Sequence, residues 1–259
     1  MLYAALTFWL LVIVLTAWGV HQLWSGMVKP KVFNTILLPG TLAAQLGHVL
    51  GLLVTGATVS RTTLYKDDES GAPETTPDPK PRIPVVGPVI IGMLPLLACA
   101  TAIYFVARYL GQPVTTNMTA QTVGPVLPTT LAGFWQMLRD QITLVESIAA
   151  AATAADFANW KTWLFLYLLT CLTVRIAPFP GNLRGSLGAI LVLGIGAATI
   201  TSLFDVADPR VQDVHRTGCD LWSVLNLTVG TLLFLLLASL LIRGAVGLVQ
   251  VLRSEPQGS

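Results

Sequence analysis

Charged side chains are scarce in this chain of 259 residues. Asp, Glu, Lys and Arg make up 11% of it, whereas hydrophobic residues make up 54% and the mean hydropathy is +0.71. Soluble domains carry roughly 25% charged residues, so this composition excludes an ordinary water-soluble domain. We therefore expect an integral protein of a plasma or inner membrane, with the lipid bilayer and other membrane protein subunits as its partners.

Two other shortages exclude further classes of function. The net charge is only +2 and the basic residues are scattered singly, so the chain has no clustered basic face for a nucleic-acid backbone. The three cysteines, Cys99, Cys171 and Cys219, lack the Cys-x-x-Cys spacing of metal or redox sites. We expect them to fill small apolar spaces.

Long apolar runs recur along the chain. A helix needs about 20 apolar residues to cross roughly 30 Å of hydrocarbon. The runs cover residues 2–24, 32–59, 85–110, 160–177, 187–204 and 221–252. They predict an all-α, polytopic transmembrane helix bundle of about six spans, which forms a single membrane domain. No basic residue precedes the first run and no cleavage site is evident, so we expect residues 1–24 to be a retained span.

Residues 61–84 interrupt the apolar pattern. This segment contains five prolines and charges of both signs. Clusters of Pro, Gly and polar residues between periodic segments are typical of loops. The segment therefore predicts a solvent-exposed loop, with a hairpin at its edges as one option.

An amphipathic pattern lies between the third and fourth runs. Apolar residues recur at helical spacing at Leu131, Trp135, Leu138, Ile142, Val145 and Ala149, opposite Arg139, Asp140 and Glu146. This spacing predicts a helix that lies on the membrane or against the bundle. Such a helix acts either as a plain packing element or as a lateral gate or docking helix for a partner.

The second run contains the pentapeptide Ala44-Gln45-Leu46-Gly47-His48, which is a broken version of a zinc-hydrolase motif. In His-Glu-x-x-His, two imidazoles one helical turn apart bind the metal, and the Glu takes a proton from the metal-bound water. Here Ala44 stands at the first His position and Gln45 at the Glu position. An amide has no basic group at neutral pH, so Gln45 cannot act as a general base.

Three segments, in order, resemble the site-2-protease family of intramembrane zinc metalloproteases. Residues 38–48 (LPGTLAAQLGH) look like the first core helix of the family, and residues 87–97 (GPVIIGMLPLL) are similar to the second. Residues 177–182 (APFPGN) resemble the Pro-rich break that carries the third ligand, an Asp, at the position of Asn182. The resemblance implies a protease-like core over residues 33–204, in a degenerate and inactive member.

The degenerate-site positions that this resemblance implies are Ala44, Gln45, His48 and Asn182. One neutral imidazole and two amides make a poor zinc site, because zinc normally has three or four Cys, His or carboxylate ligands. We therefore expect no metal, no cofactor and no enzyme activity. Two roles stay open for His48. It is either a proton relay or ligand contact inside the membrane, or a neutral remnant held by a hydrogen bond between helices.

Residues near this site have packing and interface roles of their own. Ala43, Gly47 and Gly51 recur every four residues and form a smooth strip that lets another helix approach closely. Arg175 and Arg184 flank the Pro-rich break. We expect both at the membrane interface, where they extend to the headgroups or contact an anionic lipid or a partner.

These observations lead to three functional hypotheses. The first is a pseudoprotease that serves as a scaffold or accessory subunit of a larger membrane complex. The alternative is a membrane transport or small-molecule-binding protein with a polar cavity near His48 and Asn182. The third is an active metalloprotease with relocated ligands, which would need His21 or His215 to join His48 although both lie near span ends or in loops.

Overall fold

The protein is mainly helical in a computed structural model that describes residues 2–56, 58–63, 74–78, 87–115, 130–176 and 209–254, with scattered positions between 188 and 199. Its helices are α1 (Leu2–Met27), α2 (Pro30–Ile36), α3 (Leu38–Val54), α4 (Gly87–Leu110), α5 (Gln112–Thr115), α6 (Leu131–Ala154), α7 (Trp160–Val174) and α9 (Pro209–Ser254). Two strands, β1 (Thr58–Thr63) and β2 (Glu74–Asp78), complete it. The predicted helical character is confirmed.

Three of the described helices are long and apolar enough to cross a bilayer. They are α1 over Thr7–Met27, all of α4, and α9 over Val224–Val249. The bent pair of α2 and α3 passes the same test when it is taken together, which gives up to four candidate spans in the described part of the chain. This is consistent with the predicted membrane location. The predicted span at 187–204 lies largely outside the described residues.

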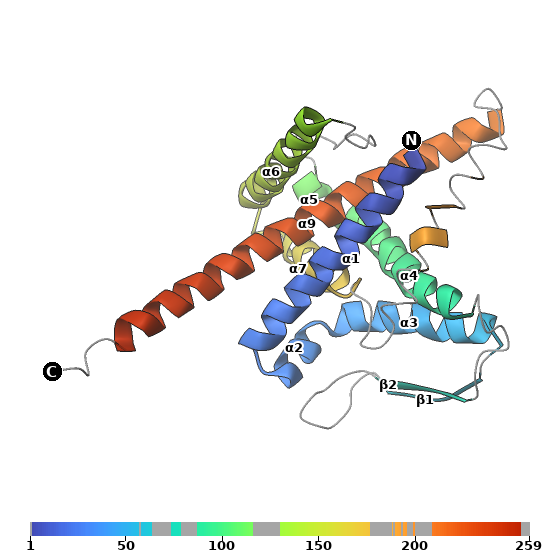
Figure 1. Cartoon of the computed structure of the whole chain (residues 1–259), viewed down its shortest axis with the longest axis horizontal. Coiled ribbons are helices and arrows are strands. Elements are labelled where there is room, and N and C mark those ends of the chain that lie inside the picture. The colour runs from blue at the N-terminus through green and yellow to red at the C-terminus, as the bar shows by residue number, and fades with distance from the viewer. Residues whose placement is uncertain are drawn as a thin grey trace.

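Helices α1 and α9 run side by side (Figure 1). The indole Nε1 of Trp24 donates a hydrogen bond of 2.6 Å to the hydroxyl of Ser239. Gly19 brings the backbone of α1 close to the side chain of Leu236. With 46 residues, α9 is about 69 Å long at 1.5 Å per residue, which is more than the roughly 30 Å of a bilayer's hydrocarbon core.

Helix α9 begins before the predicted last span. The apolar run predicted at 221–252 contains the candidate span Val224–Val249. The polar residues before this run belong to the same continuous helix, which begins at Pro209. Proline is favourable in the first turn of a helix, and no other proline follows before Pro256, so nothing in this stretch breaks the helix.

A sharp bend divides the predicted span at 32–59 into two helices. The axes of α2 and α3 differ by 77°. Pro39 favours the break, because it has no N–H to donate to the carbonyl of Thr35 and its ring clashes with that carbonyl in a regular helix. Figure 1 shows α1 ending beside α2, and α4 beginning beside the end of α3, so the chain enters and leaves the bent pair on the same side of the bundle.

The polar segment forms a hairpin, as one of the sequence interpretations predicted. Strands β1 and β2 pair antiparallel, with Thr58 opposite Asp78 and Thr63 opposite Glu74. An irregularity between Val59 and Arg61 shifts the register. The hairpin lies below α3 in Figure 1, on the side of the bundle away from α6.

Helix α7 is shorter than the span predicted at 160–177. It has 15 residues and is therefore about 22 Å long, which is less than the roughly 30 Å of a bilayer's hydrocarbon core. Its last residues, with the capping Arg175, are buried. The C-terminal end of α7 thus lies inside the bundle.

Helix α6 exists as predicted but packs through another face. Leu144 and Ile148 are buried and lie against Gly230 of α9, where an added Cβ would collide with both side chains. The predicted apolar stripe is exposed instead: Leu131 is 85% exposed and Trp135 is 60% exposed. The stripe is therefore not the face that holds α6 on the bundle.

Candidate functional site

The helix with the degenerate motif, α3, lies directly against the backbone of α4. A Cβ built on Gly47 would lie 2.6 Å from the carbonyl oxygen of Leu94, and a Cβ on Gly51 would lie 2.9 Å from Cα of Ile91. Real Cβ atoms essentially never come this close to backbone atoms, so only glycine fits at either position without a shift of the helices. Ala43, the third member of the predicted strip, is half-buried against the main core.

The positions that would carry catalytic groups belong to this closed face. Ala44 is 1% exposed and Gln45 is 4% exposed, whereas His48 is half-buried one turn further on. The hydroxyl of Thr41 donates a hydrogen bond of 3.0 Å to the Leu37 carbonyl of its own helix. Ala44 and Gln45 are thus buried in the same helix that meets the backbone of α4 at Gly47 and Gly51.

Several predicted site residues lie outside this description. Asn182 and Arg184 are outside the described residues, so their predicted roles stay predictions. The side chain of His215 is also outside them. His21 is half-buried on α1, with its ring 5.1 Å from the ring of Phe33. Where side chains are described, no three His, Cys, Asp or Glu residues gather as a metal ion would require.

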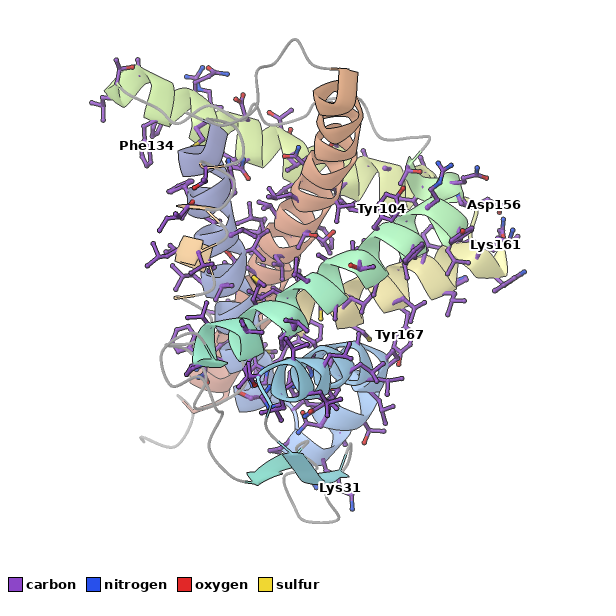
Figure 2. All side chains as sticks on the ribbon, turned by 90° about the vertical axis from the view of Figure 1, so that its right-hand side faces the viewer. Lys31, Tyr104, Phe134, Asp156, Lys161 and Tyr167 are labelled. Atoms are coloured by element: carbon purple, nitrogen blue, oxygen red, sulfur yellow. The ribbon has the colours of Figure 1, made fainter. Side chains whose placement is uncertain are left out.

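The bend between α2 and α3 is stabilised by α7. The hydroxyl of Tyr167 donates a hydrogen bond of 2.8 Å to the carbonyl oxygen of Ile36, and the thiol of Cys171 lies 3.4 Å from the same oxygen. Figure 2 shows Tyr167 on the side of α7 that faces these two helices. An unsatisfied backbone carbonyl costs several kcal/mol in hydrocarbon, so a broken helix needs such donors. We call Ile36, Tyr167 and Cys171 the break contact.

Arg175 lies inside the bundle beside the break contact. It is 8% exposed, donates a hydrogen bond to the amide oxygen of Asn34, and holds its guanidinium carbon 5.5 Å from the centre of the Phe33 ring. Arg175 caps the end of α7, and Asn34 belongs to the last turn of α2. The partial negative charges of both helix ends and the aromatic face therefore stabilise this cation. The described contacts of Arg175 are within the chain, and its predicted contact with headgroups, an anionic lipid or a partner stays a prediction.

The sequence prediction missed most of this arrangement. Tyr167 and Asn34 carried no signal, and Cys171 was expected only to fill space. Pro39 was the one local sign at this place, because a proline removes an N–H and leaves a carbonyl that needs another donor. Which helix would supply the donors depends on tertiary packing and leaves no local pattern.

No known protein family, curated protein or solved structure matches this chain. The resemblance to the site-2-protease family thus rests on the three sequence segments and stays a prediction.

Replacing Gly47 by Ala should destabilise the protein by about 1–3 kcal/mol, the usual range for an overpacked contact. The added methyl meets the α4 backbone, which cannot move aside as a flexible side chain would. The matched control is Gly244→Ala on α9, where nothing lies within 4 Å of the added Cβ. There the higher helix propensity of alanine should be neutral or slightly stabilising. Thermal unfolding in one detergent compares the two variants, and equal shifts would contradict the close approach of α3 to α4.

Replacing Tyr167 by Phe removes the hydroxyl donor of the break contact but keeps the ring. We expect a loss of about 0.5–1.5 kcal/mol, the usual net value of one hydrogen bond. Tyr109→Phe serves as the control, because Tyr109 is 71% exposed on α4. Unfolding curves measure both variants, and an unchanged stability of Tyr167→Phe would show that the Ile36 carbonyl does not depend on α7.

Proposed function

We propose that this chain is a non-catalytic integral membrane protein on a site-2-protease-like scaffold, and that it serves as a structural or accessory subunit of a larger membrane complex. The supporting observation is that Ala44 and Gln45 are buried on α3, the helix whose Gly47 and Gly51 meet the backbone of α4. In this proposal the polytopic bundle has about six spans and lies in a plasma or inner membrane.

The contact between α3 and α4 supports a packing role for the motif helix. Gly47 and Gly51 bring two backbones together, and such close approach maximises van der Waals contact between membrane helices. A helix fixed in this way makes a rigid platform. The face of α3 that supports the bundle is the one on which the resemblance would place chemistry.

The opposite face of α3 is available to other molecules in the membrane. A row of leucines at helical spacing is exposed there: Leu38, Leu42, Leu46, Leu50 and Leu53. Lipid or a helix of another subunit can cover such a row. The scaffold proposal assigns part of this row to a neighbouring subunit, which packs on a surface that the rigid contact with α4 holds in place.

The alternative, a transport or small-molecule-binding role, draws on polar groups near His48. The described geometry does not favour it, because the Thr41 hydroxyl bonds to its own helix and Gln45 is buried. Asn182, the other polar group of this hypothesis, lies outside the described residues.

Metal analysis and particle mass together test the proposal. Protein purified from its own membranes in mild detergent should contain less than one zinc per chain, with the same value in His48→Ala and in the control His21→Ala. The protein mass of the particle should exceed the 27.7 kDa of one chain. The particle should contain other subunits in a fixed ratio to this chain. One zinc per chain that is lost in His48→Ala but kept in His21→Ala would contradict the proposal. A purely monomeric particle would contradict the subunit role.

A further inference from the structure

Helix α6 has three chemically different faces. Successive residues advance about 100° around a helix, so each residue can be assigned to a direction. The face on the bundle consists of Met137, Leu144, Ile148 and Ala151. The polar face consists of Gln136, Arg139, Thr143 and Glu146. The third face is apolar and exposed, and it consists of Leu131, Phe134, Trp135 and Ile142. The centres of the three faces are about 120° apart.

The third face of α6 is apolar and is not buried by the rest of the chain. Leu131 is 85% exposed, and Trp135 and Ile142 are each 60% exposed. Figure 2 shows Phe134 on the part of α6 that projects past the bundle. Apolar surface in water costs about 25 cal/mol for each Å², so a strip of large side chains of this kind is unfavourable unless something covers it.

The neighbouring polar face of α6 indicates what contacts its exposed apolar face. A helix in the plane of a membrane interface turns an apolar face to the acyl chains and a polar face to water. Arg139 and Glu146 are exposed in the chain, and their charges suit the water side of such an interface. In α6 the bundle takes the remaining third of the circumference, so all three faces have a suitable environment at the surface of a bilayer.

Exposed aromatic residues lie at the ends of the neighbouring helices α4 and α7. Trp160 and Trp163 at the start of α7 are 64% and 60% exposed, and Tyr109 at the end of α4 is 71% exposed. Trp and Tyr are enriched where hydrocarbon meets the headgroups. Asp156 and Lys161, which lie together in Figure 2, stand in the corner between α6 and α7. These residues place a membrane–water boundary at the end of the bundle that α6 crosses.

We infer that α6 is a docked interfacial helix, with Leu131, Trp135 and Ile142 among the acyl chains of the bilayer. Its polar face carries both signs of charge, including Arg139 and Glu146, so attraction to anionic lipids does not hold it there. Packing of Leu144 and Ile148 on α9 holds the helix there. The helix fixes the depth of the bundle in the membrane, a role that is separate from the proposed scaffold function.

Spin labels on neighbouring residues test this inference. The full chain, with Cys99→Ala, Cys171→Ala and Cys219→Ser, carries a single cysteine at 135, 136, 142 or 143 and is placed in lipid nanodiscs. Oxygen concentrates in hydrocarbon, and a nickel chelate stays in water. Labels at 135 and 142 should collide mainly with oxygen, and labels at 136 and 143 mainly with nickel.

Two results would overturn the inference. If labels at 135 and 142 collide mainly with nickel, the apolar face is in water. If they are protected from both reagents, a protein covers that face, either a second copy or another subunit.

A second measurement uses the unmodified chain, in case the cysteine replacements disturb folding. Lipids with a photoactivatable group in the acyl chain should crosslink to residues 131–142 of α6 and to the exposed apolar part of α9 near Leu240 and Leu241. Crosslinks to α9 without any to α6 would also overturn the inference.

Discussion

The close approach of α3 to α4 sets the arrangement of the other helices. Gly47 and Gly51 remove the side chains that would separate the two backbones, and no side-chain rearrangement can replace that contact because the opposing atoms belong to the backbone of α4. In a bilayer, lipid tails are as apolar as leucine, so helices associate through tight packing rather than through the hydrophobic effect. A contact of this kind fixes α3, and with it the positions of Ala44, Gln45 and His48.

The bend at Leu37 is the second constraint and depends on the first. With α3 held against α4, the chain has to turn from α2 into α3 near the end of α7, and the turn leaves the Ile36 carbonyl without a helical donor. Tyr167 and Cys171 contact that oxygen, and Arg175 fixes the last turn of α2 through Asn34. A short α7 that ends inside the bundle is therefore explained: its C-terminal half serves the bend, and a full crossing would carry these groups past it.

The sequence predicted what depends on local pattern. Apolar runs predicted most of the described helices, and the proline-rich segment left a hairpin as one option. The four-residue spacing of Gly47 and Gly51 indicated a strip for helix approach. The sequence did not predict properties that depend on the partner helix. The apolar stripe at Leu131 and Trp135 faces away from the bundle. Periodicity alone does not show whether such a stripe contacts lipid or protein. From the sequence we expected Arg175 at the membrane interface. No local pattern shows that this cation meets two helix ends and an aromatic ring.

The central claim is that the motif face of α3 is closed against the bundle. A cysteine at position 44 tests it most directly, since Ala44 is 1% exposed in the middle of that face. In membranes, Ala44→Cys should resist a small water-soluble thiol reagent until the protein is denatured, while a cysteine in place of the exposed Gly26, where nothing lies within 4 Å of an added Cβ, reacts at once. Rapid modification of the cysteine at position 44 in the folded protein would contradict the claim, because it would show a water-filled site where the structure has a helix contact.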